Sequence, residues 1–227
     1  MRRKNKLIVI ILISIILTYF IYFFNREEKI RLVAIGDGIA SGETSYNIDG
    51  ISYNDYIKEY FDSKKLLKNY NNNYAFKNYK LEELINDIKN NVIDKKSNMY
   101  IEQIMHKANI VTICIGEDEL TKLEITQDLD EEYIKEFINN YDILLGYLKK
   151  ITDAKIIIVG LYENTYLEKS KTIIINSELS NIAKKNDVIF INVCDLLLNK
   201  DYYLNNNSYY FSYKGHETIA EIIIHSL

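Results

Sequence analysis

One stretch of the chain, residues 30–42, constrains the fold more than any other. It reads Ile-Arg-Leu-Val-Ala-Ile-Gly-Asp-Gly-Ile-Ala-Ser-Gly. The apolar residues 32–35 are followed at once by two glycines flanking an aspartate and then by a helix-compatible segment, which indicates a buried strand turning sharply into a helix. In parallel α/β sheets, ligands bind at the carboxyl ends of the strands, where amides at helix starts face them. This turn is therefore the first place to expect a functional site.

The rest of the chain alternates short apolar runs with segments of helical spacing. We expect further strands at residues 74–76, 109–115, 155–160 and 188–193, and helices at 53–67, 81–93, 99–106, 131–150, 172–185 and 216–227. Strands that alternate with helices and consist largely of Val and Ile predict a parallel sheet covered on both faces. A length of 227 residues with 48% hydrophobic content suits one buried domain. The predicted fold is a three-layer α/β/α sandwich with a five-stranded parallel sheet.

The amino terminus predicts a membrane anchor. Four basic residues lie within residues 1–6, and residues 7–24 contain no charge. Eighteen uncharged, mainly apolar residues are enough to cross a hydrocarbon core, and no small-residue cleavage site of a signal peptide follows them. Because the basic residues precede the span, we expect a cytoplasmic amino terminus at residues 1–6, a transmembrane helix at 7–24, a linker at 25–29 and an extracytoplasmic domain at 30–227.

The charge of that domain bears on its partners, and its two cysteines bear on whether it contains a disulfide. The first 25 residues hold four of the 28 basic residues and no acidic one, so the remainder carries a formal charge of −8. An acidic domain argues against nucleic acid as a partner. Cys114 and Cys194 lie in or at the end of two apolar runs. They are compatible with a disulfide or with two buried free thiols.

Two short blocks of the sequence carry a family resemblance. Gly36-Asp37-Gly38-Ile39 and the pair Gly215-His216 resemble the first and last blocks of the SGNH/GDSL hydrolases, which have a flavodoxin-like α/β fold. The resemblance covers roughly residues 30–226 and implies an esterase or lipase-like protein whose functional residues follow successive strands. In that family the reaction depends on a serine nucleophile and an Asp–His pair. A glycine amide and an asparagine form the oxyanion hole.

The positions equivalent to those catalytic residues are changed in this chain. They are Gly38 for the serine, Asn78 for the glycine, Asp118 for the asparagine, and Asn207 and Tyr210 for the aspartate and the histidine. Losing the nucleophile or the base of such a unit costs on the order of 10⁶ in rate. The resemblance therefore implies the fold, while the substitutions predict a protein that is inactive by the serine mechanism.

Other side chains near the same strand ends are candidates for a pocket. The full set is Asp37, Gly38, Ser41, Glu117, Asp118, Glu119, Tyr210 and His216. Ser41 has a nucleophile's chemistry but reads as a first-turn hydroxyl, and the resemblance gives His216 a structural place at the start of the last helix. If the acidic members and Glu43 gather at one place, they raise one another's pKa values or bind a cation. The alternative is that they cap turns and face the solvent.

Two functions of different class remain open. One is a non-catalytic domain that binds an envelope glycan, lipid or protein in the crevice where the resembled family has its active site. The alternative is an active esterase or deacylase on envelope glycan or lipid esters with a rearranged catalytic set. Aromatic residues near the presumed crevice suit stacking on a sugar, namely Tyr202, Tyr203, Tyr209, Tyr210, Phe211 and Tyr213. We expect neither a metal nor a cofactor.

Overall fold

The computed structural model describes residues 12–15, 17–18, 29–44, 50–126, 129–164, 167–194, 200–204 and 210–227. Most of the expected anchor at residues 7–24, the expected linker up to residue 28 and the acid position Asn207 lie outside the described residues. Within the described ranges, no helix combines the length and the apolar character that crossing a bilayer requires.

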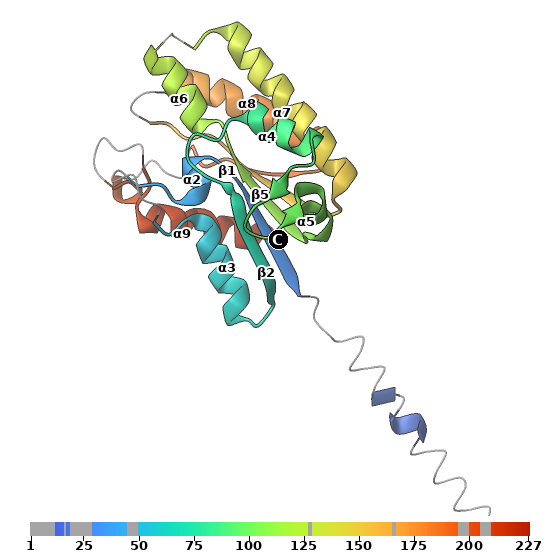
Figure 1. Cartoon of the computed structure of the whole chain (residues 1–227). Helices are drawn as coiled ribbons and strands as arrows, with labels where there is room; N and C mark the ends of the chain where they lie inside the picture. The colour runs from blue at the N-terminus through green and yellow to red at the C-terminus, as the bar shows by residue number, and fades with distance from the viewer. Residues whose placement is uncertain are drawn as a thin grey trace, which may run out of the picture.

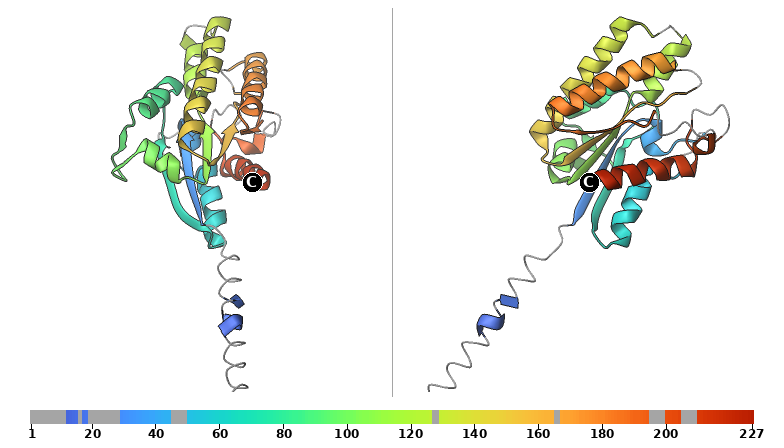
Figure 2. Two further views of the ribbon diagram at one scale, coloured as in Figure 1. Left: turned by 90° about the vertical axis from the view of Figure 1, so that its right-hand side faces the viewer. Right: turned by 180° about the vertical axis from the view of Figure 1, so that it is seen from behind.

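A five-stranded sheet forms the middle layer, as the sequence predicts (Figures 1 and 2). Every neighbouring pair in it is parallel. In spatial order its strands are β2 (Leu67–Ala75), β1 (Ile30–Gly36), β5 (Ile110–Cys114), β6 (Lys155–Val159) and β7 (Ile189–Ile191). Because the strands are parallel, all of their carboxyl ends lie at one edge of the sheet.

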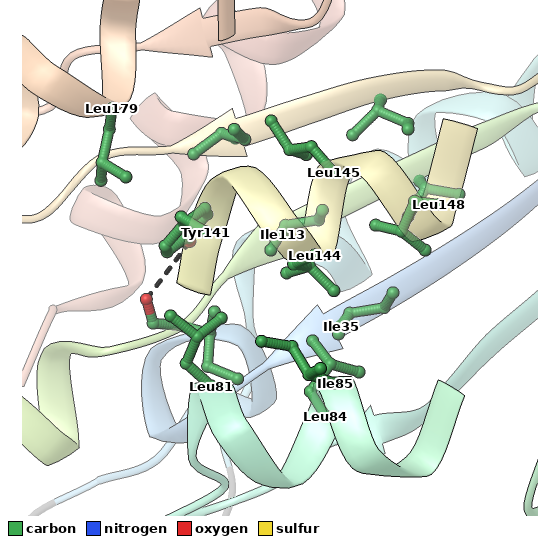
Figure 3. Close-up of a cluster of buried hydrophobic side chains, with 14 of the residues drawn as sticks. Ile35, Leu81, Leu84, Ile85, Ile113, Tyr141, Leu144, Leu145, Leu148 and Leu179 are labelled. Carbon is green, nitrogen blue, oxygen red and sulfur yellow. Dashed lines mark hydrogen bonds between the residues drawn. The ribbon is translucent and has the colours of Figure 1, made fainter. Parts of the chain in front are cut away.

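Helices cover both faces of this sheet. One face carries α3 (Tyr53–Ser63) and α9 (Tyr213–Ser226), and the other carries α4 (Leu81–Lys89), α5 (Ile101–Lys107), α7 (Glu131–Ile151) and α8 (Lys169–Lys185). The side chains of β1 alternate between the two cores, since Leu32 packs with the first set and Val33 and Ile35 with the second. Figure 3 shows the larger core, where Leu144 of α7 lies beside Ile113 of β5 and the same cluster includes Leu84 of α4.

Several elements differ from the prediction at their boundaries. The helix expected over residues 53–67 ends at Ser63, because Lys65 adopts a left-handed conformation with φ of 57°, and β2 starts at Leu67 rather than near 74. The hairpin of β3 (Ile93–Asp94) and β4 (Met99–Tyr100) was not predicted, because its sequence shows no clear alternation of apolar and polar residues. The helix α6 (Glu117–Thr126) was not predicted either.

The two cysteines are buried free thiols near the ends of two different strands. Cys114 ends β5 and Cys194 follows β7, with β6 lying between those two strands in the sheet. The intervening strand is the physical reason why a disulfide does not form, because bridged Cα atoms lie within about 7 Å of each other.

Candidate functional site

The turn after β1 begins the site. Gly36 has φ of 148°, and a Cβ built on it would lie 1.8 Å from the carbonyl oxygen of Cys114 on the paired strand β5. Only glycine fits where the two strands approach this closely. The chain then enters the short helix α2 (Gly38–Ser41), which ends at Gly42 in the left-handed conformation. The predicted strand–turn–helix is therefore present, and it places Gly38 at the carboxyl edge of the sheet.

Asp37 connects this turn to the end of β5. Its carboxylate accepts backbone N–H bonds from Ile39 at 3.4 Å, Gly116 at 2.9 Å and Asp118 at 3.2 Å. The side chain has no solvent exposure. Burial, and secondarily the nearby charge of Asp118, raise the pKa of Asp37 well above its usual range. Asp37 is thus a structural acceptor beneath the site and does not face the solvent.

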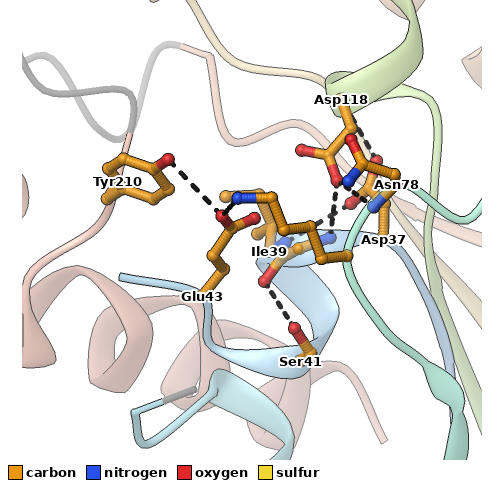
Figure 4. A network of polar contacts seen from close by, with 9 residues as sticks. Asp37, Ile39, Ser41, Glu43, Asn78, Asp118 and Tyr210 are labelled. Carbon is orange, nitrogen blue, oxygen red and sulfur yellow. Dashed lines mark hydrogen bonds and ion pairs between the residues drawn. The ribbon is translucent and has the colours of Figure 1, made fainter. Parts of the chain in front are cut away.

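Asp118 contacts the backbone of Gly38, and Figure 4 shows its carboxylate beside Asn78. One of its carboxylate oxygens, Oδ2, accepts the backbone N–H of Gly38 at 3.1 Å and that of Asn78 at 2.8 Å. Asn78 has φ of 57°, a left-handed conformation that asparagine adopts more readily than most residues. The resemblance assigns the Asn78 amide to an oxyanion hole, and the Gly38 amide donates to the same oxygen. A side chain of the chain itself therefore accepts both hydrogen bonds.

Glu43 takes up the space beside Gly38. A Cβ on Gly38 would lie 2.3 Å from the carboxylate oxygen Oε2 of Glu43, so the region where a side chain at position 38 would begin is filled. Glu43 is only 3% exposed, forms an ion pair with Lys77, and accepts a bond from the Tyr210 hydroxyl at 3.4 Å. Burial raises the pKa of the Glu43 carboxyl, and the bond to Glu43 raises the pKa of Lys77.

The structure thus brings together four of the five positions that the resemblance singles out. Gly38 and Asn78 donate to the Asp118 carboxylate, and Tyr210 donates to the carboxylate of Glu43 beside Gly38. Asn207 lies outside the described residues. Lys77 was missed by the sequence reasoning. The signal in the sequence that could have identified Lys77 is its position next to Asn78. A residue adjacent to an amide of the oxyanion hole must lie near the site.

Three other pocket candidates point elsewhere. The Ser41 hydroxyl donates to the carbonyl of Gly38 at 3.0 Å, as a first-turn hydroxyl does. Glu117 is buried under the site, where it accepts bonds from the Tyr162 amide and the Asn164 side chain. Glu119 accepts from the Leu81 amide and the hydroxyl of Tyr133, and it lines a separate small cavity between α4 and α7. The acidic cluster expected from the sequence is therefore divided among three environments.

The aromatic residues are divided in the same way. Phe211 is buried with its ring centroid 4.3 Å from that of Tyr162, and the half-buried Tyr203 packs against both rings at a tilt of 40°. Tyr213 is 61% exposed at the start of α9, and Tyr209 lies outside the described residues. Part of the aromatic set therefore builds the core, and Tyr210 is the member that reaches the site.

His216 is a structural residue. It is 2% exposed, and its Nδ1 accepts the backbone N–H of Tyr53 at 3.2 Å, which joins the start of α9 to the start of α3. Burial lowers its pKa to about 4 from an ordinary value of 6.5. The neutral ring is the form that accepts this bond, so His216 holds two helices together and offers no base to the site.

Acidification is expected to destabilise the protein through His216. Because its pKa is lower in the folded state, the contribution is fully present above about pH 6.5, decreases below it, and is lost as the pH falls through about 4. The loss should reach about 3 kcal/mol. Urea denaturation across this range should show it in the wild type and not in His216→Gln, which keeps an acceptor for Tyr53 but cannot titrate. The exposed His106→Gln is the control and should behave as the wild type.

Among the described residues, no group of three or more His, Cys, Asp or Glu side chains is arranged to hold a metal ion. The described groups around Gly38 are two carboxylates, one ammonium group and a phenol. An anionic oxygen already accepts the bonds of the two backbone amides, so a developing oxyanion would have to displace a charge of its own sign.

Solved structures with the same arrangement of elements are found among ester hydrolases. A GDSL-like lipase from Parabacteroides merdae superposes with a TM-score of 0.67 at 15% identity, over 89% of this chain and 97% of that one. A catalytic mutant of an acetylxylan esterase from Geobacillus stearothermophilus gives 0.64 at 16%, over 87% and 94%. A lipase/acylhydrolase from Enterococcus faecalis gives 0.62 at 12%, over 87% and 94%.

Sequence comparison adds one partial relative. The cell division protein DivIB from Lactococcus lactis is 25% identical over 129 residues, which are 56% of this chain and 32% of that protein. The chain therefore spans about a third of the length of this relative. No family model matches the chain.

Proposed function

From a chain that has the fold of the SGNH/GDSL hydrolases, we propose a membrane-anchored extracytoplasmic domain that does not hydrolyse esters by the serine mechanism. Its former active-site crevice binds a ligand or a partner protein of the cell envelope. The anchor is residues 7–24, with the amino terminus in the cytoplasm and residues 30–227 outside, as the basic residues before the span favour.

The bond pattern of Asp118 is the observation that carries this proposal. Its Oδ2 accepts from both Gly38 and Asn78, so the amides that would stabilise an oxyanion are already satisfied by an anion. Removing a single oxyanion donor costs on the order of 10² to 10³ in rate. Here two donors are engaged, the nucleophile position is Gly38 and the base position is Tyr210, so the losses fall on every part of the reaction.

Ester hydrolysis is the direct test. The full chain, purified in detergent and shown to unfold cooperatively, is expected to hydrolyse a small activated acetyl ester no faster than buffer. Turnover above buffer that disappears in Ser41→Ala would mean that a serine nucleophile operates and would overturn the proposal.

A specific observation supports a second candidate, an esterase or deacylase with a rearranged catalytic set. Glu43 Oε2 lies where the side chain of a nucleophile at position 38 would begin, and a carboxylate can act as a nucleophile. The ion pair with Lys77 and the engaged amides favour the binding role over this one. Loss of turnover in Glu43→Gln, with Ser41→Ala still active, would establish the second candidate.

The partial relative supports a cellular setting for the binding role. DivIB is a cell division protein, so envelope components assembled during division are the first ligands and partners to examine. The half-exposed Lys77 and the partly exposed Tyr210 are the side chains through which such a ligand would reach the site.

A further inference from the structure

The two ends of the sheet carry opposite charge. Parallel strands begin at one edge, and the helices that return between them end there. Because α3, α4, α5, α7 and α8 all run back from the site edge, their last turns gather where β1 begins, and Figure 1 shows α3 and β2 meeting at that end. Ten exposed lysines lie at this end: Lys29, Lys64, Lys65, Lys68, Lys107, Lys149, Lys150, Lys155, Lys184 and Lys185. We call these residues the basic edge.

Few acidic groups offset the basic edge. Asp62, Asp153 and Asp187 lie at the same strand starts and helix ends. Lys185 is paired with Asp142, and Lys155 donates to the backbone oxygen of Leu227. Helix dipoles favour lysines in last turns, but Lys29, Lys68 and Lys155 belong to strand starts, where no dipole accounts for them. The cationic excess therefore belongs to the whole edge.

The opposite edge is acidic. The first turns of α4 and α7 carry the exposed Glu82, Glu83, Glu131 and Glu132, beside Asp118 at the site. The lysines among them include Lys77, which is paired with Glu43, and Lys80. The domain is therefore polarised along its strands although its total charge is negative.

The position of the anchor gives the basic edge its partner. Ile30 begins β1, and the expected anchor ends at residue 24, so residues 25–29 are all that separates them. Five residues span at most about 18 Å even when fully extended. This edge of the domain therefore lies next to the membrane surface, and a lysine-rich surface there complements anionic phospholipid headgroups.

We propose that the basic edge docks on the anionic surface of the bilayer and holds the crevice at Gly38 facing away from the membrane. This inference rests on the proposed anchor. Seven residues of β1, about 23 Å of strand, then separate the crevice from the docked edge. The ligand of the crevice is accordingly a glycan or protein component that lies beyond the membrane surface, and not the lipid of the bilayer itself.

Energy transfer to headgroup-labelled lipid tests the orientation. The full chain is reconstituted into vesicles of neutral phosphatidylcholine or of phosphatidylcholine with phosphatidylglycerol, and a fluorophore is attached at Asp153→Cys on the basic edge or at Glu132→Cys on the site edge. With anionic lipid, transfer should be high from position 153 and low from position 132. In neutral vesicles, or in about 1 M salt, where screening acts over about 3 Å, the difference should shrink.

Charge reversal identifies the residues responsible. Each lysine near an anionic surface favours docking by about fivefold, so Lys65→Glu with Lys68→Glu should shift the docked-to-free ratio at least about 25-fold towards the free form. Lys80→Glu with Lys135→Glu is the matched control, because it changes the total charge equally at exposed positions near the site edge. The control should retain the wild-type transfer.

Two results would overturn the inference in distinguishable ways. If the chain stays with the vesicles after an alkaline wash but its transfer does not depend on anionic lipid, or falls equally in the control, the anchor stands and the docking is wrong. If the wash releases the chain, the proposed anchor fails and the docking with it.

Discussion

Gly36→Ala is expected to abolish stable folding, with a loss of more than about 5 kcal/mol. The added Cβ would lie 1.8 Å from the Cys114 carbonyl oxygen and 2.7 Å from the Cβ of Ala40. The first of these is a backbone atom of the neighbouring strand, so relief requires separating β1 from β5 in the middle of the sheet. The φ of 148° at this position adds strain for any L-residue.

Chemical denaturation of the purified chain measures this effect, with limited proteolysis for a variant that does not fold. Gly146→Ala is the matched control. A Cβ at that position of α7 meets no atom within 4 Å, so the same substitution should stabilise the protein by about 0.5–1 kcal/mol. Near-wild-type stability in Gly36→Ala would show that the two strands do not approach as closely as the structure has them.

Asp37→Ala is expected to lower the free energy of unfolding by about 3–5 kcal/mol at acidic pH. The substitution leaves the backbone N–H groups of Ile39, Gly116 and Asp118 without their acceptor, at about 1–3 kcal/mol for each one that stays unsatisfied. Because the pKa of Asp37 is raised in the folded state, its contribution is fully present below the unfolded pKa and is lost as the pH rises through the folded value. The cost of the substitution should therefore decrease as the pH rises.

Urea denaturation at several pH values tests this expectation. Asp130→Ala removes an aspartate that caps α7 at an exposed position and should cost only about 1 kcal/mol. Equal effects of the two substitutions would mean that Asp37 acts as an ordinary helix cap and does not join the first turn to the end of β5.

The buried strands were predictable because their signal is local. Each run of Val and Ile that reads as a strand in the sequence lies in the sheet, and the alternation of strands and helices predicted its parallel order. The boundaries of β2 were not predictable, because Leu-Lys-Asn-Tyr-Asn-Asn-Asn-Tyr carries little apolar periodicity. Among the described strands it pairs with β1 alone, at the edge of the sheet, so its backbone hydrogen bonds and the burial of Tyr74 and Ala75 keep it extended.

The sequence by itself determined which residues follow the strands. It therefore showed that position 38 has no serine and that position 210 has no histidine. Only the tertiary structure decided what replaces them. Asp118 comes from α6 and Asn78 from the segment after β2, and their meeting over Gly38 depends on β1 lying between β2 and β5. Residues 40 positions apart or more have no periodicity in common, so a hydrogen bond between them follows from packing alone. The ion pair of Glu43 with Lys77 beside Gly38 has the same origin.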